Sequence, residues 1–405
     1  MTTEPDRDAL SADWDPQGQA AWDDAFVVWE RLRTEAPIAF STAGRRGAGR
    51  FWSFLRFDDI VAAARDTVTF LNTGGSRFAT RRPPLEADPP EHSVWRRLLL
   101  PYFGPSRMLA LESASRRITS ALLEPLLAAG GGDAAHDFAR PLPPQVLLTF
   151  LNQPPDDWRQ IKTWCEDAYL QTSREDELQA RFQSADRGLW DYSAAVVADR
   201  KQHPQDPALD PVSGLLAARP DGAPLAEDLI VGTVRLLLAA GHDSTTSAVG
   251  IALHYLASHA DDQQRLRAEP SLLPSAIEEI LRLETPVLAM PRVVAHDTTV
   301  HGRQLKQGDR VMLYWASGNR DPEAFEQPDQ PRLDRKPNQH LAFGYGIHKC
   351  IGAPLARLEL RVALEEWLRR THQFGVSGEV TMEPWHRFGP RQLPVWIKTT
   401  ARGRH

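Results

Sequence analysis

The chain has 405 residues, and its 47 lysines and arginines against 53 aspartates and glutamates give a formal net charge of −6 at pH 7. Charged residues are mixed along the chain, which argues against a nucleic-acid-binding protein. Two cysteines, Cys165 and Cys350, are too few for a disulfide framework or for the four thiolates of an iron–sulfur cluster.

The sequence contains no sign of export or of membrane insertion. The first ten residues, MTTEPDRDAL, are acidic and polar, and no run of about 18 apolar residues follows. We therefore expect a protein of the reducing cytoplasm. Because no linker, charge run or internal repeat divides the chain, we expect one domain over residues 1–405, with residues 1–20 as a flexible segment.

Helical periodicity dominates the apolar residues, so the sequence predicts a mainly α fold with small β-sheets. In chain order the predicted helices are Asp24–Ala36, Asp58–Ala64, His92–Tyr102, Leu109–Ala129, Pro143–Asn152, Asp157–Tyr169, Glu177–His203, Ala226–Ser258, Asp261–Glu269, Leu273–Leu283 and Ala353–Thr371. The predicted strands are Ile38–Ser41, Phe51–Leu55, Val293–Val294, Thr299–His301, Arg310–Tyr314 and Pro394–Thr399.

Two pairs of polar residues lie at helical spacing. His92 and Arg96 are four residues apart in DPPEHSVWRR, and Glu279 and Arg282 are three apart in AIEEILRL. Each pair therefore lies on one helix face. Taken alone, the first pair indicates surface charge and the second an ordinary ion pair worth a few tenths of a kcal/mol.

The predicted helix Ala226–Ser258 is the longest, at about 30 residues or roughly 45 Å. Gly241 destabilises its centre by up to about 1 kcal/mol. The Ser and Thr hydroxyls that follow can bond to carbonyls one turn earlier and bend the helix. Asp243 and Ser244 place an acid beside an alcohol there, which suggests chemistry; the alternative is a buried polar pair that satisfies itself.

The most informative segment is FGYGIHKCIG, which runs from Phe343 to Gly352 and directly precedes a predicted helix. Gly344, Gly346 and Gly352 permit positive φ and close approach of the backbone to a flat ligand. The segment therefore predicts a tight loop that ends at a helix N-terminus.

Cys350 lies at that N-terminus, where free N–H groups and the helix dipole favour a thiolate. It could be a metal ligand or a nucleophile, and a lone cysteine is about as often a small buried hydrophobe. His348, two residues away in a tight loop, is poorly placed to act as its base.

The segment resembles the cysteine loop of the cytochrome P450 heme-thiolate monooxygenases: Phe, Gly, any, Gly, any, a basic residue or His, any, Cys, any, Gly. The other motifs follow in the order expected for that family along nearly the whole chain. The resemblance implies the single-domain cytochrome P450 fold, with heme b (iron protoporphyrin IX) between two long helices. It implies Cys350 as the axial ligand of the iron, which pushes electron density onto bound oxygen and favours O–O cleavage.

The resemblance assigns further residues to heme b and to the structure around it. It implies propionate contacts from His92, Arg96, Arg292 and His348, loop contacts from Phe343, Gly344 and Gly352, and helix contacts from Ala240 and Gly241. It implies a structural network of Glu279, Arg282 and Arg335, which holds the loop.

The stretch AAGHDSTTS resembles the family's oxygen-activation segment, with Asp243 and Ser244 as the acid–alcohol pair. The pair would relay protons to bound oxygen while bulk water is excluded. Thr is commoner than Ser at the second position, and Ser lacks the methyl group that restricts the rotamer. We therefore expect looser coupling of oxygen use to product formation.

The implied activity is insertion of one oxygen atom from O2 into an organic substrate. The two electrons would come from a separate ferredoxin or flavodoxin with its reductase, because the chain ends shortly after its last predicted strand and carries no fused reductase. We expect this partner to dock near Arg97, Lys349 and Arg361. We expect a monomer that binds neither nucleic acid nor membrane.

Substrate identity is left open by the sequence. The resemblance implies a pocket lined by parts of five segments, many of them apolar, which favours a small to medium hydrophobic compound. The segments are Asn72–Ala87, Trp164–Phe182, Leu236–Ala240, Val287–Met290 and Phe388–Leu393, with Leu237, Ala240, Val287 and Leu288 as the selected pocket residues.

The alternatives to a monooxygenase are a peroxygenase that uses H2O2 and a non-catalytic heme-thiolate sensor or recruiting protein.

Overall fold

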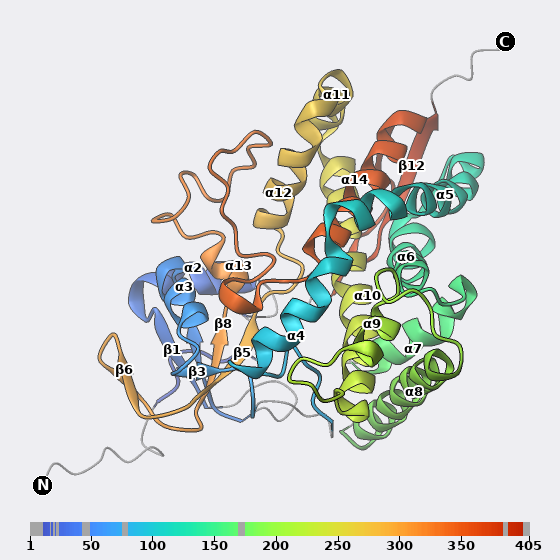
Figure 1. Cartoon of the computed structure of the whole chain (residues 1–405). Helices are drawn as coiled ribbons and strands as arrows, with labels where there is room; N and C mark the ends of the chain where they lie inside the picture. Colours follow the sequence, from blue (N-terminus) through green and yellow to red (C-terminus); the bar gives the residue numbers. More distant parts are fainter. Residues whose placement is uncertain are drawn as a thin grey trace, which may run out of the picture. The chain divides into compact units, whose positions relative to one another are not determined.

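A computed structural model of the 405-residue chain provides the fold (Figure 1). It describes residues 11–16, 18, 21, 24–42, 49–74, 80–168, 175–383 and 388–399. Several expectations lie outside the described residues: most of the flexible segment 1–20, the end of the predicted helix at Tyr169, and residues 75–79 and 169–174 of the pocket segments.

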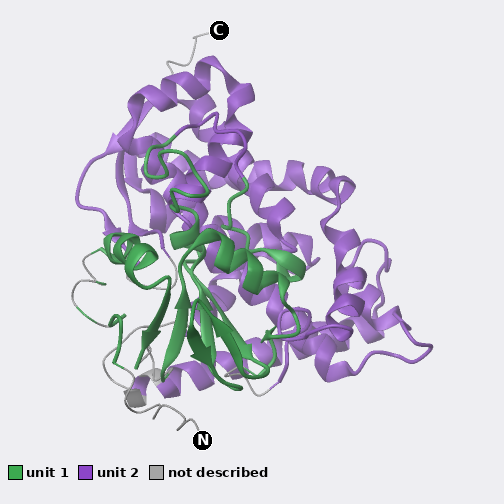
Figure 2. Ribbon diagram, turned by 90° about the vertical axis from the view of Figure 1, so that its left-hand side faces the viewer, with its two compact units in different colours: residues 1–76, 287–331, 339–349 green, residues 77–286, 332–338, 350–405 purple. Residues whose placement is uncertain are grey.

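The chain divides into two compact units (Figure 2). The boundary passes through the cysteine loop, between Lys349 and Cys350. Unit 1 comprises Met1–Ser76, Val287–Pro331 and Gln339–Lys349, and unit 2 comprises Arg77–Pro286, Arg332–Asn338 and Cys350–His405.

Unit 1 is built on a five-stranded sheet with strand order β1-β2-β8-β5-β3. β2 and β8 are parallel, whereas the other neighbouring strands are antiparallel. Every residue of β1 and β2 is buried, which fits their nearly continuous apolar sequences IAFS and FWSF. The strands are β1 (Ile38–Ser41), β2 (Phe51–Phe54), β3 (Phe70–Leu71), β5 (Met290–Val294) and β8 (Arg310–Leu313), and β6 (Thr298–Val300) and β7 (Arg303–Leu305) form a separate hairpin.

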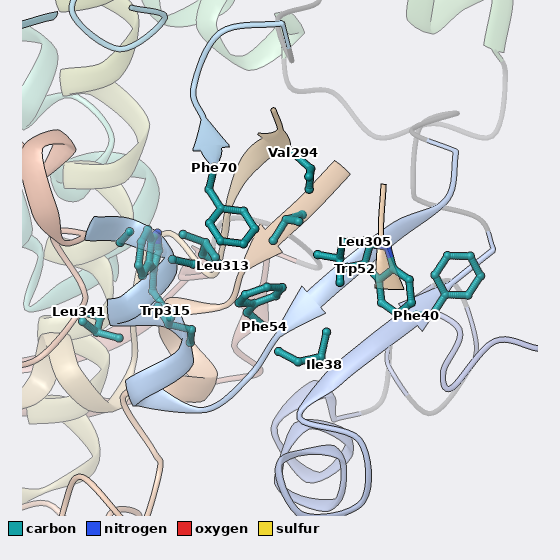
Figure 3. Packing of buried hydrophobic residues seen from close by; sticks show 14 residues of the cluster. Ile38, Phe40, Trp52, Phe54, Phe70, Val294, Leu305, Leu313, Trp315 and Leu341 are labelled. Carbon is teal, nitrogen blue, oxygen red and sulfur yellow. The ribbon is translucent and has the colours of Figure 1, made fainter. Parts of the chain in front are cut away.

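The sheet contributes to the hydrophobic core of unit 1 (Figure 3). Phe54 and Phe70 meet edge to face there, with ring centroids 5.5 Å apart. Trp315 and Leu341 belong to the same cluster, so the segment that leads into the cysteine loop is anchored in this core. The helices of unit 1 are α2 (Ala25–Glu35), α3 (Phe57–Arg65) and α13 (Trp315–Gly318), with the 3-10 turn η7 (Gly346–His348).

Unit 2 is mainly helical and is organised around α10, a 32-residue helix that packs against α6, α8 and α14 (Figure 1). α10 is buried over most of its length because apolar residues surround its axis. The longer helices are α4 (Glu91–Leu99), α5 (Pro105–Ala129), α6 (Leu142–Phe150), α7 (Trp158–Ala168), α8 (Glu175–Gln202), α9 (Pro211–Ala217), α10 (Glu227–Ser258), α11 (Ala260–Ala268), α12 (Leu273–Leu283) and α14 (Ala353–Arg370). Shorter helical turns are η3 (Leu100–Phe103), η4 (Ala134–Ala139), η5 (Pro155–Asp157) and η6 (Pro270–Leu272).

Two small sheets complete unit 2. A three-stranded sheet has the order β4-β12-β9, and a two-stranded sheet pairs β10 with β11. The strands are β4 (Gly131–Asp133), β9 (Thr371–Val376), β10 (Thr381–Met382), β11 (Pro390–Gln392) and β12 (Pro394–Thr399).

The predicted helices and strands are confirmed within a few residues at each end that the structure describes, and the mainly α fold class is confirmed with them. Sequence reasoning missed α9, a seven-residue helix too short to establish a period. It also missed β4, whose sequence GGD carries no strand signal. In the described parts of the chain, no helix is both long and apolar enough to cross a bilayer.

Candidate functional site

Cys350 lies just before α14, whose N-cap residue is Gly352. The thiol is free and accessible on one side. Desolvation by the surrounding protein raises the pKa of the thiol, and the backbone N–H groups of Gly352 and Ala353 oppose that rise, as do the charges of Arg96 and Arg357. The local fold therefore directs hydrogen-bond donors and positive charge at this sulfur.

The glycines of the loop differ in their conformations. Gly344 and Gly346 have φ of +70° and +69°, as expected for positions that need glycine. The expectation for Gly352 is wrong, because its φ is −79°. Gly352 serves as the N-cap of α14, and a Cβ there would meet the Cys350 sulfur at 3.8 Å, an ordinary contact distance.

α4 brings His92 and Arg96 to one helix face in unit 2. His92 is buried, and desolvation, followed by the charge of Arg96, lowers the pKa of its imidazole. Burial also lowers the pKa of the Arg96 guanidinium, and interaction with Cys350 opposes this effect. The structure thus places Arg96 within electrostatic reach of Cys350.

The middle of α10 is open on one side. Ala240 is exposed and Gly241 and Ser244 are half-buried, whereas Leu237 is buried. The Ser244 hydroxyl donates to the Ala240 carbonyl at 3.0 Å, the back-bond expected from the sequence. A Cβ at Gly241 would lie 3.0 Å from Cδ2 of Leu147, so glycine there permits close packing on α6.

Asp243, next to this open face, is held by a lysine that the sequence analysis did not identify. Lys162 of α7 donates from Nζ to Oδ1 of Asp243 at 2.7 Å and to the Thr246 hydroxyl at 3.3 Å. Lys162 is 2% exposed and Asp243 is 7% exposed. A buried lysine of α7 and a buried carboxylate of α10 therefore form an ion pair.

Lys162 also lies near Glu166, a partly exposed residue one turn later on α7. Its Nζ lies 3.9 Å from Oε1 of Glu166, whose side chain is 41% exposed. Arg140 binds Glu166 with two hydrogen bonds, one of 2.7 Å from Nε and one of 2.5 Å from Nη2. Charged groups thus extend from Asp243 to the surface of unit 2.

Glu279 is the centre of a buried ion-pair network. Its carboxylate accepts hydrogen bonds from Arg282 at 2.8 and 2.9 Å and from Arg335 at 3.0 and 3.1 Å. Asn338 and the backbone N–H of Arg332 add bonds of 3.1 and 2.9 Å. Desolvation raises the pKa of Glu279, but these donors outweigh it and hold the pKa below its usual value. Asn338 and Arg332 were not identified from the sequence.

Unit 1 holds the first half of the cysteine loop. Phe343 packs near His340, with ring centroids 6.0 Å apart, and the Gly344 N–H donates to the Leu341 carbonyl at 2.8 Å. His348, half-buried, ends the η7 turn, in which the Lys349 N–H bonds to the Gly346 carbonyl at 3.2 Å.

Three further predicted residues belong to unit 1. Arg292 lies buried on β5, and its Nη1 donates to the Pro291 carbonyl at 2.7 Å. Leu288 is buried and accepts a backbone bond from Ala316 at 3.2 Å, while Val287 is half-buried. The contacts of Arg292 and Leu288 thus lie within unit 1.

The three cations expected at the docking surface differ in their surroundings. Arg97 and Lys349 are exposed. Arg361 is instead engaged within unit 2, where it bonds to Glu112 at 2.7 Å and to Glu365 at 3.0 Å. Its positive charge is therefore largely offset.

Comparison with known proteins gives the same family throughout. The family model described as Cytochrome P450 matches residues 173–384. Cytochrome P450 109 of Bacillus spizizenii is 32% identical, over 92% of this chain and 91% of the relative. Mycinamicin IV hydroxylase/epoxidase of Micromonospora griseorubida is 33% identical, over 85% and 89%. The crystal structure of CYP109E1 from Bacillus megaterium with testosterone superposes with a TM-score of 0.85 at 32% identity, covering 94% of this chain and 99% of that one.

The fold and these matches define the class of protein as a heme-containing oxidoreductase. The chain belongs to the cytochrome P450 family, and it is a monooxygenase whose cofactor is heme b.

The residues present fit this cofactor. Cys350 offers a free sulfur with two N–H donors and two nearby guanidinium groups, a donor set suited to a metal-bound thiolate. The open face of α10 at Ala240 is lined by small residues, so a flat ring could pack closely against it.

Proposed function

We propose that this monooxygenase inserts one oxygen atom from O2 into a small to medium hydrophobic organic molecule, with two electrons from a separate ferredoxin or flavodoxin and its reductase. The observation that carries the proposal is the buried Asp243, bonded to Lys162 and adjacent to Ser244 on the open face of α10. An acid and an alcohol at that place suit proton delivery to oxygen.

The proposed heme contacts follow the motif positions. Cys350 would bind the iron through its sulfur, and Phe343, Gly344 and Gly352 would surround that sulfur in the loop. His92, Arg96, Arg292 and His348 would hold the propionates through charge-assisted hydrogen bonds, and Ala240 and Gly241 would contact the ring. The network of Glu279, Arg282 and Arg335 has a structural role and holds the chain near the loop.

When bound, heme b supplies the binding of O2 and its reductive activation. Asp243 takes up a proton from the solvent side, where Glu166 is a partly exposed acid on α7, and passes it on toward the Ser244 hydroxyl. Lys162 holds the Asp243 carboxylate in place through the hydrogen bond of 2.7 Å from its Nζ to Oδ1. The apolar side chains around α10 exclude bulk water.

Leu237, Ala240, Val287 and Leu288 are the proposed pocket residues, and three of them are apolar side chains larger than alanine. A relative acts on mycinamicin IV, and a solved neighbour was crystallised with testosterone. Steroids and macrolides are therefore the first compounds to titrate, followed by terpenoids and aromatic compounds. A shift of the heme absorption band on titration identifies a ligand of the site.

Turnover with different oxidants tests the reaction type. Product formed with O2, reduced nicotinamide and a ferredoxin–reductase pair supports the proposal. Product formed as fast with H2O2 alone would favour a peroxygenase, and absence of product under both conditions for every ligand found would favour a sensor or recruiting protein.

We propose that residues 1–405 act as one heme domain, as a monomer in the cytoplasm. A sedimentation experiment on the heme-loaded protein tests the monomer, since a mass near 45.3 kDa is expected.

A further inference from the structure

Tyr345, at a position that the cysteine-loop pattern leaves open to any residue, is held by a specific partner in unit 1. Nη2 of Arg65 donates to its hydroxyl at 2.7 Å. The guanidinium carbon also lies 5.1 Å from the centroid of the tyrosine ring, within the range of a cation–π contact. One arginine therefore binds both the polar end and the face of this side chain.

The next residue fixes the backbone against the same helix. Gly346 has φ of +69°, and a Cβ there would lie 2.3 Å from the Ala64 carbonyl oxygen at the end of α3. α3 is itself anchored at its start, where the Phe57 N–H donates to Oδ2 of Asp321 at 2.8 Å. The loop thus packs on a helix whose start is held by a hydrogen bond.

This contact is joined to the heme ligand by only four residues. The η7 turn follows directly, and its Lys349 N–H bonds to the Gly346 carbonyl at 3.2 Å. Lys349 is covalently bonded to Cys350. Only this short turn separates Tyr345 from Cys350 along the chain.

We infer that Arg65 is a positioning residue for the heme ligand: with Tyr345 it clamps the cysteine loop on α3 in the form that presents the Cys350 thiolate to iron. The inference rests on the proposed role of Cys350. An exposed pair of this kind contributes little to global stability. Its effect is on the geometry and hydrogen bonding of the thiolate, which tune a metal centre from outside its ligands.

The test compares heme-loaded Arg65→Met and Tyr345→Phe with the wild type. Arg65→Met keeps an apolar stem but removes both contacts, whereas Tyr345→Phe removes only the hydrogen bond. Under mild urea, the ferrous carbonyl complex converts from the thiolate-type spectrum to a spectrum without a thiolate ligand. We expect the ratio of converted to unconverted complex to rise about threefold to tenfold in Arg65→Met, with a smaller rise in Tyr345→Phe. We also expect a changed heme reduction potential.

The matched control is Arg159→Met, which removes an arginine–aromatic contact of 4.9 Å with Trp158 on α7. It should leave the ratio within about twofold of wild type, as ordinary surface substitutions do. If Arg65→Met behaves like Arg159→Met in both ratio and potential, the clamp has no such role and the inference is overturned. A wild-type protein that lacks the thiolate-type spectrum would instead overturn the proposed role of Cys350.

Discussion

Asp243 and Lys162 form a buried ion pair whose two members depend on each other. Both side chains are nearly inaccessible to water, and the lysine also bonds to Thr246. Removing one partner of such a pair leaves an uncompensated buried charge. Lys162 therefore affects both the stability of unit 2 and the position of the proposed proton donor.

Replacement of Lys162 by methionine should lower the free energy of unfolding by about 3 kcal/mol. The variant should also form less product per O2 consumed, because Asp243 loses the hydrogen bond from Nζ of Lys162 that fixes its carboxylate next to Ser244. Urea unfolding and the ratio of product to O2 measure the two effects. Lys162→Arg, which keeps the charge, is the control. A Lys162→Met enzyme with wild-type product yield would show that the lysine is only structural.

Ser244 permits a second test at the same place. Its hydroxyl bonds to the Ala240 carbonyl, and no methyl group restricts its rotamer. Ser244→Thr should raise the share of consumed O2 that appears as product, and Ser244→Ala should lower it. Equal yields in all three proteins would remove this hydroxyl from the proton relay.

The spacing of Glu279 and Arg282, together with the family resemblance, predicted the ion-pair network. Glu279, Arg282 and Arg335 could be grouped from their motifs, and the structure joins them at one carboxylate. Lys162 could not be found in this way, because it is 81 residues from Asp243 and the pair exists only through the packing of α7 on α10. Its sequence neighbours indicate only an amphipathic helix.

At the scale of elements, an ion-pair network joins α5 to α14, the helix that starts beside Cys350. Arg116 of α5 bonds to Glu365 at 2.7 Å and to Glu366 at 3.0 Å. Glu112 of α5 bonds to Arg361 at 2.7 Å. Hydrogen bonds from Arg361 and then Arg116 lower the pKa of Glu112 to about 2.

This shift has a defined sign for stability. The folded-state pKa of Glu112 is depressed, so its stabilising effect is present above the unfolded value near 4.5 and is lost as pH falls from there toward 2. We expect Glu112→Gln to lower the free energy of unfolding at pH 7 by about 1 kcal/mol or less, because solvent screens this partly exposed network. The difference from wild type should shrink as the pH of the urea unfolding experiment falls below 4.5.

Glu35→Gln is the matched control, since Glu35 is paired with Arg31 on the exposed face of α2. This substitution should lower the free energy of unfolding by no more than a few tenths of a kcal/mol. If Glu112→Gln lowers the free energy of unfolding as much below pH 4.5 as at pH 7, the ion pairs of Glu112 are not the source of the effect.

The elements also show where sequence reasoning fails. The long helix α10 and the strands β1 and β12 were predicted at or within one residue of their bounds, because α10 and β1 are nearly continuous apolar runs and β12 alternates in burial. β4 consists of two glycines and an aspartate, and it exists only because β12 supplies its hydrogen-bonding partner. A strand that depends in this way on a partner distant in sequence has no recognisable local sequence pattern.

At the scale of the whole molecule, two features could not be foreseen. Each compact unit is assembled from segments distant in sequence, so no composition change marks the boundary. The engagement of Arg361 with acids of α5 and α14 likewise depends on the packing of two helices. The docking proposal therefore relies on Arg97 of unit 2 and, separately, on Lys349 of unit 1, rather than on Arg361.

An acidic electron donor should be attracted by these exposed cations although the chain as a whole carries a charge of −6. We expect Arg97→Glu to slow heme reduction by a ferredoxin at low salt, and the difference from wild type to shrink as salt screens the charges. Stopped-flow reduction measures this, with dithionite reduction as the control for an intact heme. An unchanged rate with ferredoxin would place the docking surface elsewhere.

The most direct test of the account is the absorption spectrum of the ferrous carbonyl complex of the purified, heme-supplemented protein, recorded alongside Cys350→His. A sulfur anion at position 350 predicts the thiolate-type spectrum in the wild type and its loss in the variant. A colourless wild-type protein, or a spectrum like that of a histidine-ligated heme, would contradict the account.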